Sequence, residues 1–460
     1  MNNRPAQLTL SQWQERYTQL KTAGLQEPAY GGPLLRHADQ GDKRLACLKF
    51  DNSPAALHLW NFLLSEEDRL RQHRVKGKLI IGTMKDLGTV PILVDSFDEM
   101  VAFYPDGAWW TPCLKQMHEG LFEIAAQHGL DESFCPVRAM VGAFVNGKHF
   151  PIPDALICSV GATCDDFSIA AQRVESLGHS VFWWEMPHRR TPSTTEPSVT
   201  LPCGFTAPQY QIDHLRLQLQ QIQQFLEHKA GRALHPDDLR RTIRNVNHIR
   251  RLFGNIQQLC FTAPVAPMGS LELLIAEMLM IHFCSDMAQT EWILEAFLSE
   301  IRTRMDNAQG ILPADAARIF WVNPVADLYA MNLLEECGGR LCGTEFLFAH
   351  ALEPIPDHDD PLTALAQMAL SDPMAGSAFD RAELIARKIR QFGSEAVVIS
   401  RIPGASHCAF EGRIISQWIQ DHLGLPTIEI EVPTLTDSYR PSLQTRLEAL
   451  IETVKTRRKS

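Results

Sequence analysis

The sequence contains neither of the two familiar glycine-rich motifs that bind phosphate groups. Without them, we do not expect the chain to hydrolyse ATP itself or to hold a standard dinucleotide. A run of about 18 apolar residues is also absent, so no helix is expected to span a bilayer. Residues 1–8 lack the apolar core of a signal peptide, which predicts a cytoplasmic protein.

Basic residues are fewer than acidic ones, and the cysteines are too few for a disulfide scaffold. The 460 residues include 43 Lys and Arg against 54 Asp and Glu, a formal net charge of −11. This balance argues against broad electrostatic binding to nucleic acid or to an anionic membrane. Eleven cysteines are too few for a disulfide scaffold of this length, and their number is odd. In a cytoplasmic chain they are core residues, metal ligands or reactive thiols, and most are expected to be core.

The apolar residues follow an α/β pattern. At 45% hydrophobic and 21% charged residues, the chain is a globular protein long enough for two or three domains. Alternating apolar character at 78–82 and 90–94 is typical of strands. Apolar runs at 154–160 and 180–186 flank a helical period at 165–178, which predicts a βαβ unit and a parallel sheet.

A second α/β pattern starts near residue 317, after a strongly helical region over 210–305. Strands are predicted at 317–322, 341–348, 396–400 and 427–431, and helices at 325–337, 409–422 and 441–457. Residues 187–207 are rich in Pro and Thr and are expected to form a linker. The predicted domains are an N-terminal helical extension (1–75), a first α/β domain (76–207), a helical region (208–310) and a second α/β domain (311–460).

Two cysteines occupy corresponding places in these two α/β patterns. Cys164 lies in the loop between a predicted strand and helix, and Cys408 lies in the equivalent loop of the second domain. In open parallel sheets, ligands bind at the carboxyl ends of the strands, where such loops converge. Both cysteines are at or next to helix N-termini, which favour a thiolate.

A third candidate, Cys135, precedes Pro136 in a segment where Arg138 can offset the charge of a thiolate. Spacing alone leaves these three cysteines open to two interpretations, ligands or inert loop residues, because they form no ferredoxin-type run. Cys158 is expected in the core. The remaining cysteines are interpreted as structural (Cys337, Cys342) or have no partner that spacing identifies (Cys47, Cys113, Cys203, Cys260, Cys284).

At these residues the sequence resembles the family of 2-hydroxyacyl-CoA dehydratases and ATP-dependent benzoyl-CoA reductases. The resemblance runs from about Lys76 to the end of the chain. Its landmarks are Cys135-Pro136, Thr163-Cys164-Asp165, His407-Cys408 and the segment 424–431. It implies an α/β fold of two flavodoxin-like doubly wound parallel-sheet domains, with an intervening helical region and an N-terminal helical extension. It also implies one [4Fe–4S] cluster per chain, bound by Cys135, Cys164 and Cys408.

The same resemblance implies the iron–sulfur subunit of a lyase that removes water from an (R)-2-hydroxyacyl-CoA by radical chemistry. Three thiolates leave one iron open to the substrate. The implied partners are the acyl-CoA substrate, a separate ATP-dependent iron–sulfur activator, and a homologous second subunit or a second copy of the chain. Three alternatives stay open: a benzoyl-CoA reductase-like oxidoreductase subunit, a noncatalytic electron-relay subunit, and a two-domain binding protein with buried cysteines.

Four polar residues near the cysteines are candidates for proton transfer or for hydrogen bonds to sulfur: His407, Asp165, Arg138 and Glu411. Each also has an ordinary interpretation. Asp165 suits a helix N-cap, Glu411 suits the first turn of a helix, and the other two suit polar loop positions.

Part of the family carries a double-cubane cluster on additional cysteines of the second α/β domain. The matching segments of this sequence are 323–326, 344–347 and 371–374, and none of them contains cysteine. We therefore expect a single cubane.

Overall fold

The computed structural model describes residues 4–26, 45–109, 118–282, 285–347, 352–358, 360–433 and 437–459. Cys113 and Cys284 fall outside these ranges, and the side chains of His407 and Cys408 are outside the described part as well. Within it, no helix combines the length and the hydropathy needed to cross a membrane.

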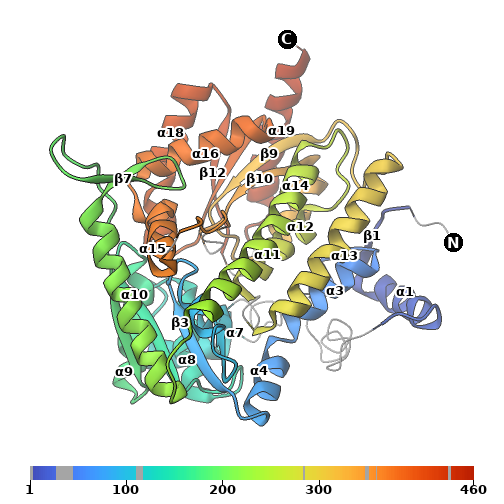
Figure 1. Ribbon diagram of the computed structural model, residues 1–460. Coiled ribbons are helices and arrows are strands. Elements are labelled where there is room, and N and C mark those ends of the chain that lie inside the picture. Colours follow the sequence, from blue (N-terminus) through green and yellow to red (C-terminus); the bar gives the residue numbers. More distant parts are fainter. Residues whose placement is uncertain are drawn as a thin grey trace.

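Two four-stranded parallel sheets form the frame of the molecule (Figure 1). The first has the order β4-β3-β5-β6 and the second β10-β9-β11-β12, so both follow the order 2-1-3-4 within their own domain. The strands are β3 (Leu79–Met84), β4 (Met100–Phe103), β5 (Ala155–Gly161), β6 (Val181–Met186), β9 (Ala317–Val322), β10 (Gly339–Glu345), β11 (Ala396–Arg401) and β12 (Thr427–Glu431). Two doubly wound, flavodoxin-like α/β domains are therefore confirmed.

Helices cover both sheets. Those of the first domain are α5 (Val90–Val94), α7 (His118–Gln127), α8 (Ala139–Asn146) and α9 (Asp165–Ser176). Those of the second are α14 (Tyr329–Glu336), α15 (Pro361–Ser371), α16 (Ala378–Phe392), α17 (Ser406–Phe410), α18 (Gly412–Leu423) and α19 (Arg440–Lys459). The helix predicted at 409–422 is thus two helices, and the backbone of Cys408 lies inside the first of them, α17, and not in a loop.

The prediction of a strand at 90–94 is wrong, because these residues form the short helix α5. Asp86 accepts a hydrogen bond from the Val90 N–H at 2.8 Å, and Pro91 sits in the first turn, where its missing N–H costs nothing. All five residues of α5 are buried, so the apolar pattern reports burial and not the period of a strand.

Four long helices form the region between the α/β domains: α10 (Gln209–Ala230), α11 (Pro236–Thr262), α12 (Ser270–His282) and α13 (Met287–Asp306). In Figure 1, α10 runs beside the first domain and α11 crosses the middle of the molecule. Their arrangement matches the helical scaffold expected there.

The segment 187–207 is more structured than the expected linker. It contains β7 (Ser198–Thr200), which pairs antiparallel with β8 (Thr206–Pro208). Arg189 is buried against the second domain, where its guanidinium donates to the Leu370 carbonyl oxygen at 2.7 Å and to Asp380 at 3.1 Å. The segment therefore joins the two domains by side-chain contacts as well as by the chain.

The N-terminal region packs against the helices of the middle region. It contains β1 (Gln7–Thr9), α1 (Leu10–Thr22), β2 (Lys49–Asp51), α3 (Pro54–Leu64) and α4 (Glu66–Val75). The antiparallel pair β1–β2 was not predicted from the sequence. Every residue of α3 after Pro54 is buried, so α3 is a core helix of the whole protein. Whether the four predicted domains are independent units stays a prediction.

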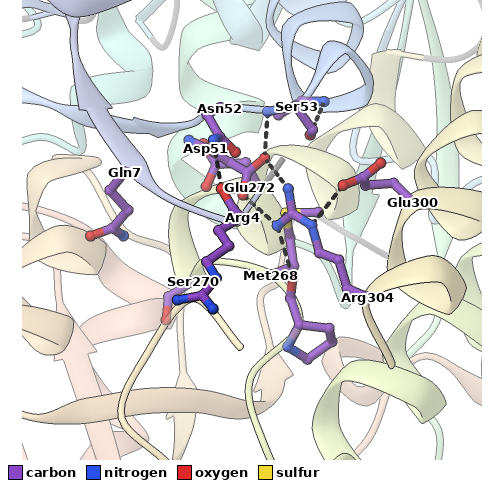
Figure 2. A network of polar contacts seen from close by, with 12 residues as sticks. Arg4, Gln7, Asp51, Asn52, Ser53, Met268, Ser270, Glu272, Glu300 and Arg304 are labelled. Carbon is purple, nitrogen blue, oxygen red and sulfur yellow. Dashed lines mark hydrogen bonds and ion pairs between the residues drawn. The ribbon is translucent and has the colours of Figure 1, made fainter. Parts of the chain in front are cut away.

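A buried ion pair fixes this N-terminal region (Figure 2). Asp51 of β2 accepts two hydrogen bonds from Arg304 of α13, at 2.6 and 2.9 Å. Arg304 also donates to Glu300 at 2.7 Å, and the Asp51 N–H donates to Glu272 of α12 at 3.0 Å. Burial and the neighbouring Asp51 raise the pKa of Glu272 to about 8, so Glu272 adds little negative charge to the network at neutral pH.

Candidate functional site

Each sheet reverses its winding between its first and third strands, between β3 and β5 in one domain and between β9 and β11 in the other. Ligands of such sheets bind outside the carboxyl ends of the strands at this switch point. Cys164 follows β5 and Cys408 follows β11. The two cysteines therefore lie at the same topological place in both domains.

The backbone is held alike at both switch points. Lys85 follows β3 with a φ of +48°, and Asn323 follows β9 with a φ of +72°. Ser159 of β5 donates to the Lys85 carbonyl oxygen, and Ser400 of β11 lies 3.2 Å from the Asn323 carbonyl oxygen. Both serines are fully buried. A left-handed residue after the first strand is thus stabilised by a serine from the third.

The turn after β5 positions Cys164. Gly161 has a φ of +105°, and a Cβ there would lie 2.1 Å from the carbonyl oxygen of Met186, so only glycine fits. The turn makes Cys164 the N-cap residue of α9. Its side chain is 7% exposed, and its Sγ lies 3.5 Å from Asp166 Oδ2 and 3.8 Å from Ser406 Oγ.

Cys135 precedes a short 3-10 helix, η3 (Pro136–Arg138), and is 9% exposed. The Arg138 guanidinium donates to the carbonyl oxygen of Phe134 and lies 4.2 Å from the centroid of the Phe122 ring. Burial lowers the pKa of Arg138, and the nearby Cys135 counteracts part of this shift. A half-buried cation therefore lies close to the Cys135 thiol.

The loop between β11 and α17 touches both other cysteine loops. Gly404, with a φ of +81°, lies so close to Phe134 that a Cβ would come within 2.5 Å of the Phe134 carbonyl oxygen. The N–H and the hydroxyl of Ser406 donate to Asp166 Oδ2 at 2.9 and 2.8 Å. Cys408 is two residues further along α17. Neighbours of all three cysteines are thus in direct contact, although the cysteines are far apart in the sequence.

Lys85 adds a buried cation to this edge. Its Nζ lies 4.6 Å from the centroid of the Phe167 ring and 3.7 Å from Met374 Sδ. Burial raises the pKa of the Cys164 thiol, and the positive charge of Lys85 opposes that shift. A nearby opposite charge favours the thiolate that a metal requires.

A buried arginine organises the corresponding edge of the second domain. Arg381 donates to Glu345 at 2.6 and 3.0 Å, to Glu411 at 2.7 Å and to the Asn323 side chain. Glu345 ends β10, Asn323 follows β9 and Glu411 separates α17 from α18. Arg381 therefore links the carboxyl ends of two strands to the helix that carries Cys408.

The predicted polar candidates have different surroundings. Asp165 is exposed and is the first residue of α9, so its expected role as N-cap is wrong and Cys164 holds that place. Glu411 is the N-cap residue of α18, and its side chain is paired with Arg381. The side chain of His407 lies outside the described residues. The structure brings the segments of these candidates together, and their chemical roles stay a prediction.

Three residues of this site were missed from the sequence. Lys85 stands directly after a buried strand, at the carboxyl edge where ligands bind, and this position was an available signal. Asp166 is adjacent to Asp165, but the sequence gives no way to tell which of the two faces the other domain. Arg381 has no local signal, because its partners come from distant segments.

Among the other described cysteines, three are buried in the core. Cys158 lies within β5 and is fully buried, and burial raises its pKa. Cys342 in β10 and Cys260 in α11 are buried as well. The interpretation of Cys158 and Cys342 as core residues is confirmed.

The family model described as 2-hydroxyglutaryl-CoA dehydratase, D-component, matches residues 96–454. The chain belongs to this family. No curated protein matches the sequence. The match includes β5, α9, β11 and α17, and its residue range contains all three candidate cysteines. As a member of the dehydratase family, the chain is a component of 2-hydroxyacyl-CoA dehydratase type.

The site of this dehydratase component has the donor chemistry that an iron–sulfur cluster requires. Thiolates are the usual ligands of such clusters. Cys135 and Cys164 are buried at one edge, Cys408 is carried by the adjoining α17, and Lys85 and Arg138 supply positive charge. Cys135 and Cys164, the two candidate ligands whose side chains the structure describes, are compatible with the cluster that the resemblance implied.

Proposed function

We propose that the chain is the iron–sulfur subunit of a 2-hydroxyacyl-CoA dehydratase-like lyase acting on an (R)-2-hydroxyacyl thioester. The observation that carries this proposal is the contact among the three cysteine loops, made by Ser406 with Asp166 and by Gly404 with Phe134. Core cysteines such as Cys158 lie within strands, whereas Cys164 is the N-cap residue of α9, Cys135 precedes η3 and Cys408 lies in α17, which follows β11.

Cys135, Cys164 and Cys408 would hold one [4Fe–4S] cluster per chain. When bound, such a cluster supplies reducing electrons and one iron with an open position for Lewis-acid chemistry. The residues of the chain prepare this place. Lys85 and Arg138 offset the negative charge of the thiolates, since each acts electrostatically on a neighbouring cysteine.

Other residues hold the edge in position or handle protons. Asp166 ties α9 to α17 through Ser406, which fixes the separation of the two cysteine loops. Arg381 orients Glu411 Oε2, which can accept a proton or a hydrogen bond near α17. Asp165 is exposed and accessible to water, and His407 precedes Cys408 directly.

The proposed partners are the acyl-CoA substrate, a separate ATP-dependent activator that delivers electrons in the cytoplasm, and a homologous subunit or a second copy of the chain. A reductase-like subunit and an electron-relay subunit would hold the same cluster. They differ in the product, because only the lyase releases water from the thioester.

The test is an anaerobic count of iron and sulfide after cluster reconstitution of the full chain. About four irons per chain are expected, as for one cubane. Cys135→Ala, Cys164→Ala and Cys408→Ala are each expected to lose most of that iron. Cys158→Ala is the matched control, because this thiol lies on the same strand–helix unit but points into the core, and it should keep its iron.

Supplying an ATP-dependent activator and an (R)-2-hydroxyacyl-CoA to the reconstituted chain should then give the unsaturated thioester, detected by mass. An absence of iron in the wild-type chain, or equal iron in the Cys158 and Cys164 variants, contradicts the cluster. Four irons without dehydration, alone and with a homologous subunit, contradicts the lyase and leaves a reductase or relay role.

A further inference from the structure

A cavity of about 300 Å³ lies at the carboxyl end of β10, between α12, α15 and α16. This volume is at the lower end of the range for small-molecule sites. Much of its wall is apolar, and this part comes from Phe346, Leu347, Leu352, Met368, Leu384 and Ile385. Among the described residues, none of the contacts between the three cysteine segments uses these side chains.

Two routes connect this cavity to the cysteine edge. On one side, Glu345 lines the cavity and is bound to Arg381, which also holds Glu411, three residues beyond Cys408. On the other side, the cavity wall at 371–373 continues into Met374, whose Sδ contacts the Nζ of Lys85 at 3.7 Å. The cavity is therefore linked to the cysteine-bearing segments of both domains through these side-chain contacts.

The polar part of the wall is acidic. Four carboxyl side chains line the cavity, from Glu277, Glu345, Glu353 and Asp372. Arg381 neutralises Glu345. Glu277 is 2% exposed and accepts a hydrogen bond from Thr344 at 2.6 Å.

Burial raises the pKa of Glu277 to about 7, and the hydrogen bond from Thr344 opposes part of this shift. A large part of Glu277 is therefore protonated at neutral pH. The protonated carboxyl of Glu277 can donate a hydrogen bond to an uncharged ligand. The ionised carboxylate instead repels a second carboxylate.

The two cations of the wall are adjacent on α16. Arg387 has a side chain that is 45% exposed, and it is bound to Glu383 at 3.2 Å and to the Cys203 carbonyl oxygen at 2.9 Å. Lys388 acts electrostatically on Glu277 and lowers its pKa. A ligand carboxylate would thus have to compete with Glu277 for Lys388.

We propose that this cavity receives the acyl group of the thioester substrate and selects an uncharged acyl group, a branched alkyl or aryl chain, over a dicarboxylate. The inference rests on the proposed function, because it takes the substrate to be a 2-hydroxyacyl thioester. The apolar wall favours a chain of carbon atoms, and the surplus of carboxyl groups disfavours a negative end. The matching family is described by a dicarboxylate, 2-hydroxyglutaryl, so this chain differs from that description in its preference.

The experiment is anaerobic titration calorimetry on the cluster-reconstituted chain with three ligands. These are 2-hydroxy-4-methylpentanoyl-CoA, 2-hydroxyglutaryl-CoA and free CoA. The branched thioester is expected to bind at least tenfold more tightly than each of the other two. Because the ligands share the CoA moiety, the difference reports on the acyl group alone.

Two variants place the preference in the cavity. Leu384→Arg adds a cation to its wall and is expected to reduce the ratio of the two thioester affinities at least tenfold. Leu217→Arg is the matched control, because Leu217 lies on α10 and is 54% exposed. This variant should leave the ratio unchanged. Glu277→Gln keeps the shape, removes the ionisable group, and should reduce the ratio several-fold even if Leu384→Arg does not fold.

Equal or tighter binding of the glutaryl thioester by the wild-type chain overturns the inference, and so does a ratio that neither cavity variant changes. No preference of the branched thioester over free CoA overturns it as well. The iron count and the release of water are measured separately. A chain that holds its iron and dehydrates 2-hydroxyglutaryl-CoA would thus retain the proposed function and lose only the acyl preference.

Discussion

The two α/β domains share one backbone design and use it with different charges. In both, a buried serine of the third strand, Ser159 or Ser400, contacts the carbonyl oxygen of the left-handed residue that follows the first strand. That residue is Lys85 in the first domain and Asn323 in the second. The serine contact is common to both domains. The residue after the first strand differs, and with it the charge near the candidate cysteine.

The difference divides the work between the domains. Lys85 places a buried positive charge beside Cys164. Asn323 instead accepts a hydrogen bond from Arg381, which forms ion pairs with both Glu345 and Glu411. The first domain therefore places a positive charge at the site, and the second supports α17 through a buried ion-pair network.

The largest expected effect comes from breaking that support with Arg381→Met. It leaves the carboxylates of Glu345 and Glu411 without their buried partner, which typically costs about 3–5 kcal/mol. Urea denaturation should show this loss in the free energy of unfolding. Lys85→Met is the matched variant of the first domain, and we expect it to cost about 1 kcal/mol or less, because the methionine keeps the contact with Phe167.

Equal losses in the two variants would contradict the division between a supporting and an electrostatic domain. A double variant, Arg381→Met with Glu345→Gln, should recover part of the stability. The second substitution removes one of the two unpaired charges, so the two effects should not be additive.

The next largest expected effect is on the pH dependence of stability, and it comes from Glu277 at the edge of the second domain. The pKa of Glu277 is raised to about 7 from its ordinary 4.5, chiefly by burial. The folded state therefore keeps a proton that the unfolded state loses above about pH 4.5, so this contribution to stability declines as the pH rises from 4.5 to 7. Glu277→Gln should remove the decline and raise stability at pH 8 relative to pH 5 by up to about 3 kcal/mol.

The measurement is urea denaturation of both proteins at pH 5 and pH 8. Thr344→Val is a useful second variant, because the hydrogen bond from Thr344 holds the pKa of Glu277 down. Without that bond, the decline should extend to higher pH. A Glu277→Gln protein with the same pH dependence as the wild type would show that the decline arises elsewhere.

The smallest effect compares the two serines. Ser400 accepts a hydrogen bond from the buried Trp321 N–H at 2.9 Å and lies 2.9 Å from the Pro324 carbonyl oxygen. Ser400→Ala leaves a buried donor unsatisfied, which costs about 1–3 kcal/mol. Ser159→Ala should cost about 1 kcal/mol, because its partners are the Lys85 carbonyl and the Thr163 hydroxyl, which can rotate. The midpoints of urea unfolding measure both, and a larger loss for Ser159→Ala contradicts the comparison.

The regular elements could be predicted from the sequence where apolar runs and helical periods are long. The strands at β5, β9, β11 and β12 are examples, and their alternation with helices gave the parallel sheets. The helix α5 and the strand pair β1–β2 could not be predicted. The five residues of α5 are all buried and therefore show no helical period of apolar and polar residues. The three-residue strands β1 and β2 depend on their pairing with each other.

The candidate site was predictable only in part, for a related reason. Cys164 and Cys408 could be placed because loops after strands converge at one edge in this topology. The contacts that close the edge were not accessible, since Ser406 meets Asp166, and Arg381 meets Glu345, across long stretches of sequence. The sequence pattern identifies which residues lie near the carboxyl edge of a sheet. Which of these residues contact one another depends on tertiary packing.

The buried pair of Asp51 and Arg304 has a consequence for how the chain matures on the ribosome. The two residues are 253 positions apart. At 5–20 residues per second, roughly 13 to 50 s separate the synthesis of one from that of the other. During that interval α3, buried on all sides in the folded protein, has no completed surface to pack against. Until α13 has emerged, the nascent N-terminal region therefore exposes apolar surface that the folded protein buries, which favours aggregation.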